Sequence, residues 1–306
     1  MSTRLLERLT RRPVATALIA AALAYGASLA LLLRTPGQSL VEPLFLLAFL
    51  GGVFPLLAWL MTRRPRDRGA VHEPAPDWRG VTAYLAVFAL VVLGFGFSFV
   101  NATFPDEPAQ SIAQLGVKLV TMVVLPAALF LGWRFTARPR FARRRLVVVF
   151  ALMAVAWLAF QAVFGRGLVT LAELAPSAAT LAWAIPACWL WQTLEAGLCE
   201  EFLFRRVTQE SFARATGSDV AAIVWASLVF GLAHAPGLWL RGAHLMEGVE
   251  VATPLWAIAY SIVMIAPAGV AFGVLWARTR SLALVVAVHG TVDLIPQLAP
   301  FIRAWT

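Results

Sequence analysis

Long apolar runs, most of them close to twenty residues in length, recur along the whole chain and are separated by short polar segments. A helix needs ~20 apolar residues to cross a hydrocarbon core of about 30 Å. The pattern therefore predicts an all-α, polytopic transmembrane helix bundle of about nine spans, with eight as the alternative count. The predicted spans are Pro13–Leu33, Val41–Met61, Val81–Val100, Val117–Trp133, Leu146–Phe164, Thr180–Leu198, Val220–Ala235, Pro254–Trp276 and Leu282–Leu298.

The composition supports this reading. Of the 306 residues, 60% are hydrophobic and 13% are charged, whereas soluble domains have roughly 25% charged residues. One soluble core of this size cannot bury so much apolar surface, so we expect a lipid bilayer to surround the chain. The net charge is +9, but its arginines cluster between the apolar runs. We therefore expect no nucleic-acid partner.

Arginine-rich and arginine-poor loops alternate along the chain. The rich segments contain Arg4, Arg8, Arg11 and Arg12; Arg63, Arg64, Arg66 and Arg68; Arg138, Arg140 and Arg143–Arg145; Arg205, Arg206 and Arg214; and Arg278 and Arg280. Positively charged loops stay in the cytoplasm. The alternation predicts a multi-pass protein of the cell (inner) membrane with a cytoplasmic N-terminus, and it places the loop at Glu247–Glu250 outside. The preference for Arg, Ala and Leu indicates a GC-rich bacterial genome.

Ionisable residues divide the chain into two parts. Few occur at mid-depth in the first five spans, and several occur in the last four. We therefore predict an N-terminal transmembrane bundle over residues 1–166 and a second domain, with a polar centre, over residues 167–306. The two cysteines, Cys188 and Cys199, lie about 16 Å apart on one helix, so we expect no disulfide between them.

The first polar cluster is a pair of adjacent glutamates followed by an arginine. Glu201 and Arg205 are four residues apart and share a helix face, so they can form an ion pair. Glu200 lies about 100° away around the helix and lacks that partner. Because ionisable groups in a bilayer are costly, Glu200 is a candidate general base. The alternative is a pair of structural carboxylates at the end of the span.

Two histidines form the second and third clusters. Phe230 and His234 lie one turn apart near a predicted helix end, and His289 and Asp293 lie one turn apart on the last span. Each histidine alone also fits a structural role. Three polar clusters on three helices can converge inside a bundle, where such groups avoid lipid. Gly269 and Gly273 form a step of small residues that would let helices approach closely there.

The ordered motifs E-E-x-x-x-R, F-x-x-x-H and H-x-x-x-N/D resemble those of the CAAX protease and bacteriocin-processing (Abi) family, which is similar to the eukaryotic CAAX prenyl endopeptidases. The resemblance covers roughly residues 183–298. It implies an intramembrane glutamate-dependent endopeptidase that acts on a peptide or a membrane-anchored protein without a cofactor. It also implies that Glu200 and His234 activate water, that His289 and Asp293 stabilise the oxyanion, and that Glu201 and Arg205 support them.

Two features fit this resemblance poorly. An ionised Asp293 cannot donate a hydrogen bond, so it must be protonated or must orient His289. Counted from the arginine-rich loops, His234 is deeper than Glu200, which requires that its span is tilted or broken or that the predicted boundaries there are wrong.

Other readings remain open on sequence grounds. In a zinc metalloprotease, Glu200, His234 and His289 would be the ligands. A non-catalytic bacteriocin-immunity or binding protein would keep the polar pocket without turnover. Substituting Glu200 separates these classes, because an enzyme loses turnover and a scaffold keeps its phenotype.

Overall fold

The computed structural model describes residues 12–35, 38–63, 76–133, 137–242, 246 and 252–306. Within these ranges the chain forms helices and no strand, which confirms the predicted all-α class. Several long helices contain π-helical turns, labelled η. Arg4, Arg8, Arg11, Arg64, Arg66, Arg68 and the loop at Glu247–Glu250 lie outside the described residues.

The N-terminal half forms five long helical segments, each corresponding to a predicted span. Their elements are α2 (Pro13–Leu32); α3 (Val41–Ala48), η1 (Phe49–Val53) and α4 (Phe54–Met61); α5 (Trp78–Val87), η2 (Phe88–Gly96) and α6 (Phe97–Thr103); α7 (Ala109–Lys118), η3 (Leu119–Val124) and η4 (Ala127–Leu131); and α8 (Arg143–Phe164).

The C-terminal half begins with one short helix and continues with longer segments. Its elements are α9 (Gly167–Leu174); α10 (Ala178–Gln192), η5 (Thr193–Leu198), α11 (Cys199–Glu201), η6 (Phe202–Gln209) and α12 (Glu210–Thr216); α13 (Asp219–Leu232) and α14 (Ala235–Arg241); α15 (Pro254–Tyr260), η8 (Ser261–Ile265) and α16 (Ala266–Thr279); and α17 (Leu282–Trp305).

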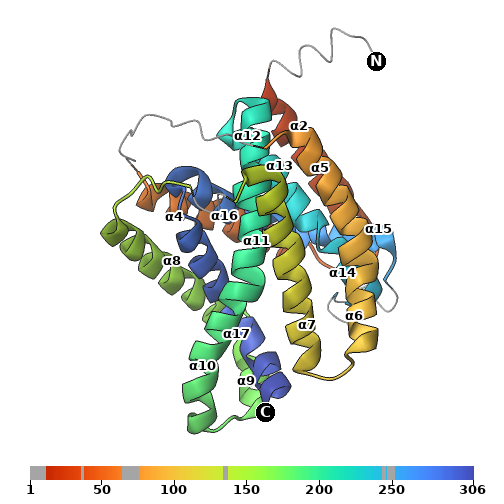
Figure 1. Ribbon diagram of the computed structural model, residues 1–306, viewed down its shortest axis with the longest axis vertical. Coiled ribbons are helices and arrows are strands. Elements are labelled where there is room, and N and C mark those ends of the chain that lie inside the picture. Colours follow the sequence, from red (N-terminus) through yellow and green to blue (C-terminus); the bar gives the residue numbers. More distant parts are fainter. Residues whose placement is uncertain (1–11, 36–37, 64–75, 134–136, 243–245, 247–251) are drawn as a thin grey trace.

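Eight of these helical segments are long and apolar enough to cross a membrane. They correspond to eight of the predicted spans. The remaining predicted span, Thr180–Leu198, forms part of the continuous helical segment 178–216, which runs along the middle of the view in Figure 1 and is called the central helix below. Gln192, Glu195, Glu200 and Glu201 make this segment more polar than the others. It is therefore the one predicted span that is not apolar enough to be identified as membrane-spanning by its length and composition.

The described parts of three arginine-rich loops meet at one end of the bundle. Arg145 donates to the carbonyl of Arg63, and Arg278 donates to the carbonyl of Thr62. Arg140 donates to the carbonyl of Ala277. This end also carries the start of α2 and the end of α12, whereas the C-terminus lies at the opposite end (Figure 1). The grouping agrees with the alternation of charge, and which end faces the cytoplasm remains a prediction.

The largest hydrophobic core cluster joins both predicted domains, because it extends from Leu50 in the second segment to Val288 in α17. Helix α13 packs closely on α16 through the predicted small-residue step. A Cβ added to Gly269 would lie 3.0 Å from the Cα of Ser227, and one added to Gly273 would lie 3.0 Å from a methyl group of Ile223. These glycines let the two helices approach closely.

Candidate active site

The structure brings five of the six predicted site residues into one network of close contacts, and the sixth, His234, lines the same cavity. Glu200 and Glu201 lie on α11 and Arg205 follows on η6; His289 and Asp293 lie on α17. His234 lies between α13 and α14. Segments far apart in the sequence therefore supply one polar site.

Glu201 is the centre of this network and is fully buried. One carboxylate oxygen accepts from Nε of Arg205 at 2.9 Å, which confirms the predicted ion pair. The other lies 2.7 Å from Nδ1 of His289. Glu201 therefore joins α17 to the long central helix, a contact that the sequence spacing could not show.

The guanidinium of Arg205 is also fully buried. It lies over the aromatic rings of Phe230 and Phe272, with its central carbon 5.1 Å and 5.9 Å from the ring centroids. Cation–π attraction of this kind contributes about 2 kcal/mol when it is desolvated. Among the described residues, its two terminal nitrogens have no hydrogen-bond partner, so the pair with Glu201 is the main compensation for burying this charge.

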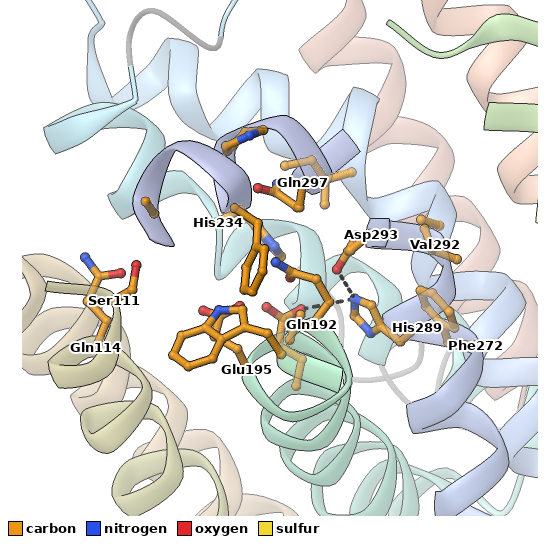
Figure 2. A pocket seen from close by; sticks show the side chains of 18 of the residues that line it. Ser111, Gln114, Gln192, Glu195, His234, Phe272, His289, Val292, Asp293 and Gln297 are labelled. Atoms are coloured by element: carbon orange, nitrogen blue, oxygen red, sulfur yellow. Dashed lines mark ion pairs between the residues drawn. The ribbon is translucent and has the colours of Figure 1, made fainter. Parts of the chain in front are cut away.

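His289 is held on several sides. Its ring stacks on Phe272, with centroids 4.6 Å apart and planes 12° from parallel. Its Nε2 atom lies 3.4 Å from Oδ2 of Asp293 and 3.9 Å from Oε2 of Glu200. Figure 2 shows Asp293 approaching the imidazole from the next turn of the same helix. This arrangement suits an aspartate that orients His289.

A break in the helix places His234. Helix α13 ends at Leu232, and α14 begins at Ala235 with Pro236 in its first turn. The Nδ1 atom of His234 lies 2.9 Å from the carbonyl oxygen of Phe230. Because a carbonyl can only accept, Nδ1 carries the proton, and Nε2 is left as the nitrogen able to accept one. The structure contains the break, and it also shows that the predicted boundary was too early, because the segment continues to Arg241 and not only to Ala235.

Lys118 and Glu195 are site residues that the sequence analysis missed. Lys118, from α7, forms an ion pair with Glu195 and lies 4.0 Å from Oε1 of Glu200. Glu200 therefore has a cationic neighbour, although not the arginine on its own helix. The sequence feature that could have predicted this contact is the single lysine within an apolar span, because a charge at such a position needs a partner inside the bundle.

These groups surround a cavity of about 530 Å³. Glu200, His234, His289 and Asp293 all line it. In Figure 2, Ser111 and Gln114 project from α7 on the side of the cavity opposite His289. A carboxylate, two imidazoles and a second carboxylate around one space are suited to proton transfer and to hydrogen bonding of a bound substrate.

Close packing holds the central helix against α17. A Cβ added to Gly290 would lie 2.8 Å from the Cα of Thr193 and even closer to its hydroxyl oxygen. One turn away, Trp189 donates to the hydroxyl of Thr291 at 3.0 Å. Cys188 and Cys199 are free and buried, which agrees with the expected lack of a disulfide.

The alternative zinc ligands, Glu200, His234 and His289, do not form a metal-binding group in the structure. Among the residues that the structure describes, no three or more His, Cys, Asp or Glu side chains are arranged so that they could hold a metal ion. Glu200 and His289 are neighbours, but His289 has its Nδ1 on Glu201 and its Nε2 near Asp293. Its two ring nitrogens are thus engaged by carboxylates.

Comparison with known proteins identifies one domain. Residues 181–295 match the family model described as type II CAAX prenyl endopeptidase Rce1-like. The match confirms the resemblance seen in the three motifs and contains all six predicted site residues, but it does not extend to Lys118. No curated protein and no solved structure matches the chain.

Proposed function

We propose that this multi-pass membrane protein, which carries a type II CAAX prenyl endopeptidase Rce1-like domain, is an intramembrane endopeptidase whose water is activated by Glu200 and His234. The substrate is a peptide or a membrane-anchored protein, cut near a membrane-associated terminus. One observation carries the proposal: Glu200, His234, His289 and Asp293, from three separate helical segments, line the same cavity.

The two glutamates have different environments, and this difference supports Glu200 as the base. Glu201 is fully buried and engages Arg205 and His289 with its two oxygens. The Glu200 side chain is 13% exposed and lines the cavity. A general base must reach the proton that it removes. Only Glu200 of the pair can contact a water molecule in the cavity.

The proposed reaction is a hydrolysis of one amide bond. A water molecule between Glu200 and Nε2 of His234 attacks the substrate carbonyl carbon while Glu200 accepts a proton. His289, as the imidazolium, keeps its Nδ1–H on Glu201 and shares its Nε2–H between Asp293, which orients the ring, and the oxyanion of the tetrahedral intermediate. The proton held by Glu200 then passes to the leaving nitrogen as the carbon–nitrogen bond breaks. The carboxylic acid that forms passes its proton to the amine, so the products are a carboxylate and a protonated amine.

Glu201 and Arg205 act as positioning residues in this proposal. Glu201 fixes Nδ1 of His289, which directs Nε2 towards Asp293 and Glu200. Arg205 keeps Glu201 in place through the adjacent ion pair. Interactions that are preorganised before the substrate binds cost no reorganisation during the reaction.

The first test is Glu200→Gln in the purified full-length protein, with Glu42→Gln as the matched control on the exposed surface of α3. Cleavage of a mixture of quenched fluorescent peptides is measured together with the melting temperature. We expect Glu200→Gln to lose turnover and to keep its melting temperature, and Glu42→Gln to change neither. A cellular phenotype that survives Glu200→Gln would favour the immunity or binding role instead.

Chelation tests the zinc alternative with the same assay. Direct activation of water by Glu200 and His234 predicts that strong chelators leave turnover intact and that the purified protein holds no stoichiometric zinc. Loss of turnover on chelation, with recovery on adding zinc, would favour the metalloprotease and would make His289 a ligand.

A further inference from the structure

The cavity opens towards one end of the molecule, as the exposure of its lining residues along α17 shows. His289 is buried, Asp293 is half-buried, and Gln297 and Pro300, further towards the C-terminus, are exposed. All four line the cavity. Exposure therefore rises from His289 to Gln297 and Pro300, and the lining residues beyond them, Phe301, Ala304 and Trp305, are buried or half-buried.

Lining residues on two other helices also extend from the polar site towards this end of the molecule. On α7 the lining residues Gln114 and Ser111 lead to Glu107, which is exposed in the loop before the helix. On the central helix the lining continues from Glu200 to Glu195 and Trp191, towards the start of α10. The loop before α7, the start of α10 and the C-terminus lie at the same end of the bundle (Figure 1).

The opposite end of the site is closed by packed side chains. Beyond Glu201 the central helix continues with Phe204, Arg205 and Arg206, each at most 1% exposed. Trp276, on α16, is fully buried. None of these residues lines the cavity. A peptide has no path to Glu200 from this side without displacing the core.

The closed end is the end at which the arginine-rich loops meet. Arg145 and Arg278 donate there to carbonyls of the loop after α4, and Arg280 pairs with Glu210 of α12 at 2.8 Å. Loops rich in arginine stay in the cytoplasm. The open end of the cavity should then face away from the cytoplasm.

We propose that the substrate reaches Glu200 from the non-cytoplasmic side of the membrane, through the mouth formed by the loop before α7, the last turn of α10 and the C-terminal turns of α17. The partner is then a peptide segment of a protein located on that side. This proposal rests on the proposed function for the cutting step. The orientation of the cavity is independent of catalysis.

The orientation is tested by single cysteines in a protein whose Cys188 and Cys199 are replaced by alanine. Gln297→Cys places a thiol in the mouth, and Arg144→Cys places a matched thiol on the exposed face at the start of α8. A membrane-impermeant maleimide added to intact cells should label Gln297→Cys, and should label Arg144→Cys only after the membrane is opened. The reverse pattern would overturn the proposal, whether or not the protein is an enzyme.

The direction of substrate entry is tested with impermeant quenched peptides added to vesicles of known orientation. We expect cleavage, abolished by Glu200→Gln, in right-side-out vesicles and at least tenfold less in inside-out vesicles. Maleimide treatment of Gln297→Cys should lower its cleavage. Cleavage confined to inside-out vesicles would overturn the proposed side of entry. If no cleavage occurs in either kind of vesicle or in detergent, the proposed function is overturned, and the labelling result alone decides on which side the cavity opens.

Discussion

The first five membrane-spanning segments and the last three differ in how much protein surrounds them. In the first five, from Pro13–Leu32 to Arg143–Phe164, 11–28% of the most apolar window is buried inside the protein. In Asp219–Arg241, Pro254–Thr279 and Leu282–Trp305 this share is 44%, 61% and 56%. The N-terminal helices thus form a periphery, and the C-terminal helices pack around the central one.

This difference explains where the polar residues are. A charged side chain facing lipid costs at least ~2.5–3.5 kcal/mol at mid-membrane, but inside the C-terminal helices it can meet a partner. Glu201, Arg205 and His289 do so. Among the first five segments, Ala109–Leu131 has the largest buried share, and it is the one that supplies Lys118 to the site.

The largest effect is expected from breaking the buried ion pair. Glu201→Gln leaves Arg205 without a carboxylate at a fully buried position. Arg205→Ala leaves the buried carboxylate of Glu201 without its arginine and with His289 as its remaining contact. Each should lower the free energy of unfolding by about 3–5 kcal/mol, measured by denaturation in mild detergent. The double variant should lose less than the sum of the two, because both single changes remove the same interaction.

Glu200→Gln is the control for this pair, since Glu200 faces the cavity and lies 4.0 Å from the ammonium group of Lys118 and 3.9 Å from Nε2 of His289. It should unfold like the unchanged protein and lose turnover. If Glu201 proved essential for turnover while Glu200 was dispensable, the assignment of the base would be reversed.

A smaller effect is expected at the contact between the central helix and α17. Gly290→Ala pushes a methyl group against the backbone of Thr193, and overpacking of this kind costs about 1–3 kcal/mol. Gly26→Ala, in the peripheral α2, meets nothing within 4 Å. It should be neutral or stabilising by about 0.5–1 kcal/mol, because alanine is the better helix former. Equal melting temperatures for the two variants would contradict the proposed difference between centre and periphery.

The smallest effect is expected from Lys118. Its side chain and that of Glu195 are 17% and 19% exposed, so water partly screens the pair. Lys118→Met should cost about 1 kcal/mol of stability. It should also lower kcat by less than Glu200→Gln does, because it removes a charge near the base and not the base. Lys118→Arg should restore most of both, and full activity in Lys118→Met would show that the periphery contributes nothing to the site.

Much of this fold could be predicted from patterns of residues that are close together in the sequence. The apolar runs predicted the helices because crossing a bilayer requires length and apolar composition in one continuous segment. The pairing of Glu201 with Arg205 followed from a spacing of four residues on one helix. The central helix was harder to judge by hydropathy, since Gln192, Glu195, Glu200 and Glu201 face protein and cavity, and a composition average cannot show which face a residue takes.

The sequence by itself determined the all-α class, the transmembrane segments, the Glu201–Arg205 pair and the identity of the domain, because each depends on residues that are neighbours along one helix or on an ordered motif. Only the tertiary structure decided that Glu201 also holds His289, that Lys118 reaches Glu195, and that the cavity opens towards the C-terminal end. These contacts join residues that lie far apart in the chain. Their distances depend on how closely helices pack at glycines such as Gly290, and no local pattern of hydrophobic and polar residues contains that information.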